Sequence, residues 1–309
     1  NPNDPDAVAL RDRLDASYGD RADVRFGFRH GDNRERQHSM GVKGRNLLGR
    51  HTYLLWDIEH RELEYGEFVR ADGDRQSFEG SRHTSAVGLG FVDGEQDYRI
   101  GLASDARTMG VEGRYELGGP GLSFAMSAGI DLPYTDSIEA RIQHATRRGL
   151  DLFLRGTSTG QWFAAGGMGW RQYDVSNVGK VGNSVRGSAT IGYSFVAANT
   201  VISYSVDIER FADIATHEGT DIPLLPIRSR NVHGIAVEFQ QKLTQVWRMR
   251  ETIGYAYSEQ GEHEPFAHFS FMRTQPRSRE LKVGANRTLD WKRAGGKAVT
   301  EVELIAPIY

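Results

Sequence analysis

The chain has 309 residues, of which 39% are hydrophobic, with a mean hydropathy of -0.52 and a formal net charge of -3. This charge is too small to indicate nucleic-acid binding, and the absence of cysteine excludes disulfides, thiol catalysis and zinc–thiolate sites. No run of about 18 apolar residues could form a transmembrane helix, whereas a transmembrane β-barrel stays possible because its strands alternate. The 36 glycines, 9 prolines and 10% aromatic residues favour many strands joined by tight turns.

Residues 1–20 are expected to be a linker or short helix at the boundary to an upstream part of a larger parent protein. The segment from Asp6 to Tyr18 places Val8, Leu10 and Leu14 at roughly helical spacing. Residues 21–309 are expected to form one β domain, because a different pattern begins there.

Apolar and polar residues alternate with a period of two through most of the chain, which indicates strands with two different faces. The pattern is clearest in Val185–Ile208, where two alternating runs flank a short turn, Ala197-Ala198-Asn199. About sixteen strands are predicted. They centre on residues 24–28, 36–47, 51–63, 85–91, 98–102, 111–117, 122–130, 150–154, 162–170, 185–195, 202–208, 235–239, 247–255, 269–271, 281–285 and 297–309.

The links between these strands alternate between short and long. Short turns are expected near Gly49, Asp93, Gly118, Ser158, Ala197, Lys242 and Gln275. Longer links are expected near residues 32, 105, 177, 258–264 and 290–296, and as the three longest segments Glu64–Arg82, Asp131–Gly149 and Phe211–Arg228. The second of these three could hold a short helix, and the other two could fold inward as gates. The alternation predicts an all-β fold, a transmembrane antiparallel up-and-down β-barrel in the bacterial outer membrane.

The aromatic residues agree with a membrane barrel. Six aromatic residues fall on the apolar faces, many near strand ends, as residues of an interfacial girdle do: Trp56, Trp162, Trp170, Trp247, Tyr193 and Tyr255. A soluble β-sandwich or propeller also uses amphipathic strands. A sandwich would not require alternating link lengths, and no propeller motif recurs.

If the apolar face meets lipid, the polar face lines a lumen. The residues expected along a substrate path in this lumen are Asp57, Glu59, Asp207, Glu209, Glu238, Glu301, Glu303, Arg186, Arg248 and Arg250. Arg25, Arg29, Arg155, Glu280 and Lys282 are further inward candidates. These charges could instead pair across neighbouring strands and only fill the interior. In the last strand the apolar pattern is ambiguous, and Glu301 and Glu303 are assigned inward because a carboxylate in lipid is costly.

The sequence offers no clear catalytic or metal site. His217, Glu218 and Asp221 share one predicted loop, and His263 lies between Glu262 and Glu264. Both groups are better explained as solvated loop charges, because no ligand spacing recurs. No cofactor, metal ion or enzymatic activity is expected, although an outer-membrane barrel enzyme and a general diffusion porin stay as alternatives.

Three segments carry a family resemblance. They are D-L-P-Y-T-D-S-I-E-A-R at 131–141, R-S-R-E-L-K-V-G at 277–284 and the closing A-V-T-E-V-E-L-I-A-P-I-Y at 298–309. With the spaced strands around them, they resemble the C-terminal porin domains of outer-membrane exopolysaccharide exporters. The resemblance is greatest to the exporter of the Pel polysaccharide, with the poly-N-acetylglucosamine exporter as a relative.

This resemblance implies a sixteen-stranded barrel that exports a biofilm polysaccharide, with a partly deacetylated, amine-bearing polymer as substrate. An acidic lumen would attract such a polymer. The resemblance also implies a helical-repeat periplasmic region of the same protein and a periplasmic lipoprotein partner, besides the surrounding outer-membrane lipid.

Overall fold

The chain was analysed as a computed structural model. It describes residues 20–30, 35–69, 75–119, 121–135, 138–157, 161–176, 178–217, 222–225, 227, 229–244, 247–259, 261, 263–275, 279–289 and 298–308. The predicted linker, residues 1–20, therefore lies outside the described residues except for Asp20. Beyond Phe271 the structure describes the backbone of the strands but not their side chains.

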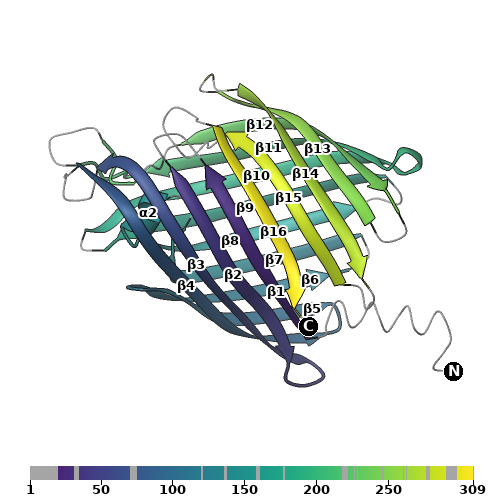
Figure 1. The fold of residues 1–309 in the computed structure, drawn as a ribbon, viewed down its shortest axis with the longest axis horizontal. Helices are drawn as coiled ribbons and strands as arrows, with labels where there is room; N and C mark the ends of the chain where they lie inside the picture. The colour runs from purple at the N-terminus through teal and green to yellow at the C-terminus, as the bar shows by residue number, and fades with distance from the viewer. Residues whose placement is uncertain are drawn as a thin grey trace.

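Sixteen antiparallel strands in the described residues form one closed barrel (Figure 1). The strands are β1 Arg21–His30, β2 Arg36–Leu47, β3 Thr52–Val69, β4 Arg75–Asp93, β5 Gln96–Asp105, β6 Met109–Gly118, β7 Leu122–Pro133, β8 Thr146–Thr157, β9 Trp162–Val175, β10 Gly179–Phe195, β11 Thr200–Ala212, β12 Arg230–Lys242, β13 Trp247–Ser258, β14 His263–Gln275, β15 Arg279–Leu289 and β16 Ala298–Ile308. Each strand pairs with the next one in the sequence, and β16 pairs with β1. The up-and-down topology predicted from the sequence is thus confirmed.

Closure is formed by the first and last strands. Phe26 of β1 pairs with Leu304 of β16, and the register runs from Ala22↔Ile308 to His30↔Thr300. Figure 1 shows β16, in yellow, beside β1, in purple. Because this pairing satisfies the backbone N–H and C=O groups of both strands, the sheet has no open edge that lipid would contact.

The outer surface is a broad apolar band. On β5, for example, the exposed Tyr98, Ile100 and Leu102 alternate with less exposed Arg99 and Gly101. The same alternation continues around the described strands. The predicted outward positions agree with it for Trp56, Trp162, Trp170, Trp247, Tyr193 and Tyr255. A soluble protein rarely exposes so much continuous apolar area, so this band is the surface that a bilayer covers.

The prediction of a loop at Glu64–Arg82 is wrong. In the structure β3 continues to Val69 and β4 begins at Arg75, so that the two strands have 18 and 19 residues. A strand needs only about 9–11 residues to cross a bilayer. The ends of this hairpin extend beyond the apolar band. Their outer face is polar, while their inner face buries Leu63 and Tyr65 against Phe78 and Ile142. The sequence there therefore lacks the outward apolar residues that mark a membrane strand.

The two ends of the barrel differ less in link length than the sequence predicted. The links near Asp105 and residue 177 were expected to be long, but they comprise only residues 106–108 and 176–178. Two loops at the same end of the barrel are much longer, residues 134–145 and 213–229. The first contains the predicted short helix, α2 (Ile138–Ile142). Within the described residues, no helix is long and apolar enough to span a membrane.

The outward register of β5 leads to a stability test. Replacing Ile100, whose side chain is 62% exposed on the outer band, with Arg places a charge in lipid. Ile100→Arg should lower the free energy of unfolding in lipid vesicles by about 2–4 kcal/mol. The matched control is Ala103→Arg on the inner face of the same strand, beside Glu112 in the lumen. Equal losses in the two variants, measured by denaturant unfolding, would contradict the assignment of the outer face.

Candidate functional site: the lumen and its plug

The lumen is lined by the side chains that alternate with the apolar band. On β1, Arg25 and Arg29 face inward, as predicted, between the outward Phe26 and Phe28. Directly opposed residues on neighbouring strands share a face. The strand registers therefore assign every described strand residue to the lumen or to the lipid.

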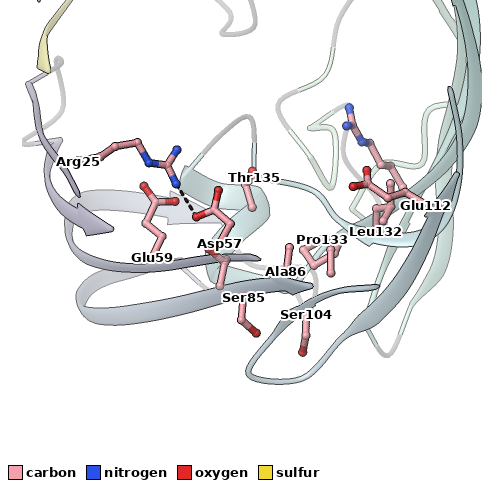
Figure 2. A pocket seen from close by; sticks show the side chains of 13 residues that line it. Arg25, Asp57, Glu59, Ser85, Ala86, Ser104, Glu112, Leu132, Pro133 and Thr135 are labelled. Atoms are coloured by element: carbon pink, nitrogen blue, oxygen red, sulfur yellow. Dashed lines mark hydrogen bonds and ion pairs between the residues drawn. The ribbon is translucent and has the colours of Figure 1, made fainter. Parts of the chain in front are cut away.

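Asp57 and Glu59 lie on the inner wall of β3, as predicted. Arg25 Nη2 donates to Asp57 Oδ1 at 2.5 Å, and Arg61 Nη2 donates to Glu59 Oε2 at 2.5 Å. Figure 2 shows Arg25, Asp57 and Glu59 on one side of a cavity in the lumen, with Glu112 on the opposite side.

Asp207 and Glu209 lie on the inner wall of β11. Arg230 Nη2 is 3.1 Å from Asp207 Oδ2 and 3.5 Å from Glu209 Oε2. Glu209 is only 5% exposed, and its Oε1 also accepts hydrogen bonds from Ser184 Oγ at 2.9 Å and Tyr173 Oη at 3.2 Å. These hydrogen bonds take the place of the water that the carboxylate loses when it is buried.

The remaining described candidates also lie on the inner wall. Arg250 Nε is 3.3 Å from Glu238 Oε1, and Arg186 Nε is 3.7 Å from Asp151 Oδ1. Arg248 occupies the inward register position opposite Lys242. Contact of any of these residues with a substrate stays a prediction.

Glu301 and Glu303 belong to β16, where only the backbone is described. Their backbone positions pair with Arg29 and Gly27 of β1, and Val302 pairs with Phe28. By this register the two glutamates share the inner face, which agrees with their assignment from the sequence.

The expected acidic lumen is not what the described residues form. Each described acid of the predicted path has an arginine partner within 4 Å: Asp57 with Arg25, Glu59 with Arg61, Asp207 and Glu209 with Arg230, and Glu238 with Arg250. The pairing alternative is therefore the one that the geometry supports. The lumen is strongly polar, but its carboxylates are neutralised locally.

A second group of inward residues was missed by the sequence analysis. Tyr53 Oη donates to Asp97 Oδ1 at 2.5 Å. Arg99 donates to both residues, from Nε to Tyr53 Oη at 3.0 Å and from Nη2 to Asp97 Oδ2 at 2.6 Å. Arg99 Nη2 also lies 3.5 Å from Glu116 Oε2. The only sequence signal was the alternation of Asp97 and Arg99 with the apolar Tyr98 and Ile100.

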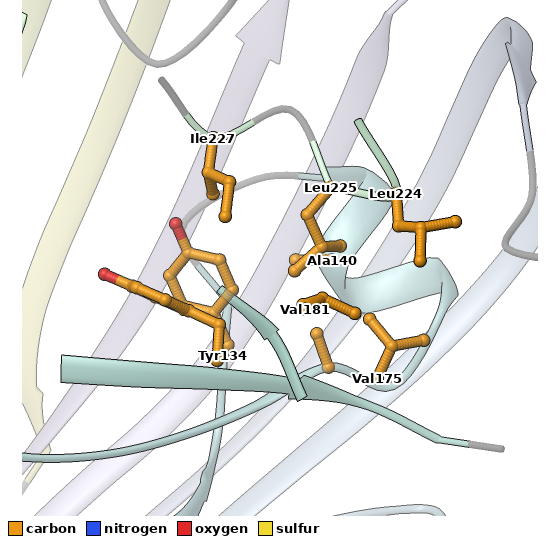
Figure 3. Close-up of a cluster of buried hydrophobic side chains, with 9 residues drawn as sticks. Tyr134, Ala140, Val175, Val181, Leu224, Leu225 and Ile227 are labelled. Carbon is orange, nitrogen blue, oxygen red and sulfur yellow. The ribbon is translucent and has the colours of Figure 1, made fainter. Parts of the chain in front are cut away.

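Apolar side chains inside the barrel join the two long loops into a plug, which we define as the described residues within 134–145 and 213–229. Its buried core comprises Tyr134, Ala140 and Ala145 of the first loop, Leu224, Leu225 and Ile227 of the second, and Tyr173, Val175 and Val181 of the inner wall of β9 and β10. Figure 3 shows Leu224 and Leu225 against the short helix α2. This cluster is the main apolar core among the described residues, and it lies within the lumen.

The first loop of the plug is fastened to the opposite wall. Tyr65 Oη of β3 donates to Glu139 Oε1 at 2.5 Å, and Arg82 Nη2 of β4 donates to the carbonyl oxygen of Ile142 at 3.2 Å. His144 Nδ1 lies 3.2 Å from Asp105 Oδ2 of β5. The plug thus connects the β3–β5 wall to the β9–β11 wall across the lumen.

The second loop is fastened at its start and to the first loop. Lys180 Nζ and Asn183 Nδ2 donate to Asp213 Oδ2 at 3.2 and 3.0 Å. The bond from Lys180 holds the pKa of the Asp213 carboxyl below its usual value. Gln143 Nε2 donates to the carbonyl oxygen of Leu224 at 3.2 Å, which links the two loops directly.

In the ranges that the structure describes, no three His, Asp or Glu side chains come close enough to hold a metal ion. Of the two loop groups noted in the sequence, Glu218, Asp221 and Glu262 lie outside the described residues. His217 was expected to be solvated, but it is only 5% exposed in the second loop of the plug.

Comparisons with known proteins define the fold. No protein-family model and no curated protein sequence matches the chain. Among solved structures, it is similar to a bacterial polysaccharide outer membrane secretin, with a TM-score of 0.61 and 8% identity over 93% of this chain and 98% of that one. It is also similar to OccAB1 of Acinetobacter baumannii, with a TM-score of 0.51 and 8% identity over 94% and 96% of the two chains.

The chain has the fold of bacterial outer-membrane barrels. At this identity the similarity concerns the fold alone. It agrees with the outer-membrane location that the apolar band and the link pattern predicted.

The plug core provides a test of occlusion. Leu225 is 1% exposed between the two loops, and Leu225→Asp should separate them because an unpaired carboxylate is costly in an apolar core. The single-channel conductance in planar bilayers should therefore rise. Ile222→Asp is the matched control, since Ile222 is 43% exposed in the same loop and should leave conductance unchanged. Unchanged conductance of Leu225→Asp, with normal heat-modifiable gel migration, would show that the plug does not limit the pore.

Proposed function

We propose that this chain is an outer-membrane channel through which an exopolysaccharide leaves the cell, and that it acts without catalysis. The observation that carries the proposal is a closed sixteen-stranded barrel with a polar, ion-paired lumen that is crossed by a plug at one end. The structural similarity to a polysaccharide outer membrane secretin supports it. So does the sequence resemblance to exopolysaccharide exporters.

The lumen suits a long hydrophilic polymer because its charges are satisfied within the wall. A carboxylate already paired with arginine still has lone pairs for a sugar hydroxyl, and the arginine still has N–H donors. Such a wall offers many weak hydrogen bonds without a single strong binding site. A polymer can therefore enter and leave, as conduction requires.

The plug supports export of a specific polymer over general diffusion. Its two loops are joined by an apolar core and by hydrogen bonds to two facing walls. An open diffusion pore has no need for such a cross-connection. In this proposal the plug restricts small solutes and is displaced when the polymer arrives.

We extend the proposal to a cationic, Pel-like polymer of a biofilm matrix. The support is the sequence resemblance and the group of inward carboxylates, of which Asp57 and Glu59 line a cavity of about 210 Å³ in the lumen. An amine of the polymer would donate to the lone pairs that the arginines leave open on these carboxylates. A periplasmic helical-repeat region and a lipoprotein partner stay as predictions of the same resemblance.

The cationic part of the proposal has its own test. The combined substitution Asp57→Asn, Glu59→Gln, Asp207→Asn and Glu238→Gln removes four carboxylates and leaves their arginine partners in the lumen. Secretion of the exopolysaccharide should fall several-fold, and the reversal potential in a salt gradient should shift toward anion selectivity. Heat-modifiable gel migration reports whether the barrel assembles.

The matched control neutralises four carboxylates outside the lumen, Glu62, Glu64, Glu79 and Glu259, each to Gln. Secretion should stay normal in this control. If the lumen variant assembles and secretes as much as the control, the polymer is not drawn by these carboxylates. The cationic assignment would then be wrong, while the channel itself would stand.

A further inference from the structure

One exposed aromatic side chain faces the lumen and not the lipid. Phe153 of β8 is 44% exposed, as much as residues of the lipid band, yet it faces the lumen. Its neighbours Leu152 and Leu154 face the lipid, and Phe153 pairs with Ala125 and Gly167 of the inner wall. Among the described strand residues, every other strongly exposed large apolar side chain faces outward, apart from Leu47 at the end of β2.

The wall around Phe153 leaves its ring uncovered. Its two partners in the sheet, Ala125 and Gly167, are small, and the next residue in the same row is Ser188 of β10. A Cβ at position 167 would lie 3.4 Å from Phe153 Cδ2 and 3.1 Å from Ser188 Oγ. The glycine therefore allows the ring to lie close to the wall beside the serine hydroxyl, with the rest of the ring open to the lumen.

Polar groups flank the ring on its own strand. Asp151, two residues toward the plug, is paired with Arg171 at 3.1 Å and lies 3.7 Å from Arg186 Nε. Arg155, two residues toward the short turn, is exposed. An open aromatic ring is thus placed between a carboxylate–guanidinium cluster on one side and a guanidinium on the other.

We propose that Phe153 is a stacking platform for a pyranose unit of the transported polysaccharide, with Asp151 and Arg155 bonding the hydroxyl or amide groups at the edge of the sugar. This inference rests on the proposed function and specifies the wall on which the polymer moves. The electron-rich face of an aromatic ring attracts polarised C–H groups, which one face of a pyranose presents together. The ring edge of the sugar carries the hydroxyls, and these would point toward the flanking charged groups.

The wall on the turn side of Phe153 carries short side chains and one further ring. The inner positions of β9 and β10 there include Ala165, Thr190 and Gly192, and also Phe163, whose ring lies over Gly192. The short side chains of Ala165 and Thr190 leave space for a polymer beside Phe153. One weak stacking site holds the chain against the wall without stopping its passage.

The test measures block of the channel current by a defined sugar. The background is the Leu225→Asp variant, in which the plug core is broken, and the probe is the hexamer of N-acetylglucosamine in planar bilayers. Phe153→Leu keeps an apolar side chain but removes the ring, and it should weaken block by roughly three- to tenfold. Phe153→Tyr should retain block, and Leu154→Ala, on the lipid face one residue away, should leave it unchanged.

The outcomes separate the two proposals. If the hexamer does not block the Leu225→Asp channel, although that channel conducts, the polysaccharide function itself is contradicted. If block is present and Phe153→Leu matches its parent, the channel function stands and the stacking platform is wrong. Normal heat-modifiable migration of each variant shows that the barrel has folded.

Discussion

Closure of the sheet is the constraint on which the rest of the molecule depends. A lipid bilayer offers no partner for a backbone N–H or C=O group, so the pairing of β1 with β16 is required for a stable structure in the membrane. Once the sheet is closed, the period of two sends alternate side chains into lipid and into the lumen. Apolar residues such as Ile100 and Ile235 are then used to cover the outside, and the inside must be filled by other means.

The inside is filled in two different ways along the barrel. Near its middle, arginines and carboxylates pair between strands that are neighbours or are separated by one strand, as Arg25 of β1 and Asp57 of β3 do. Toward the loop end, where the plug lies, apolar side chains close the space. Tyr173 illustrates the junction, because its ring lies in the plug core while its hydroxyl bonds Glu209 of the wall. The wall and the plug therefore stabilise one another.

Much of the barrel could be predicted because its signal is local. In Val185–Ile208 the alternation alone gave two strands and their turn, and the structure pairs Tyr193 with Ile202 as that hairpin requires. The end of the long β3–β4 hairpin was missed because its outer face is polar there, while its apolar side chains, such as Tyr65 and Phe78, face the plug. The partners of the inward acids were not predictable, since the contact of Arg25 with Asp57 depends on the register of three strands together.

The plug core could not be predicted for a similar reason. Leu224 and Leu225 resemble any loop residues until Tyr134 and Ala140, far away in the sequence, are placed beside them.

The distribution of the two kinds of filling bears on transport. Salt bridges within the wall keep the charged residues in place, so a polymer exported as proposed above would meet a fixed polar surface and would not need to reorganise it. The plug, in contrast, is held mainly by apolar contacts and a few hydrogen bonds to β3, β4 and β5. If a polymer displaced the plug, its hydroxyls and C–H faces would replace these contacts at little cost in free energy. In the proposed export function, the plug could therefore act as a gate that moves while the ion-paired barrel around it stays unchanged.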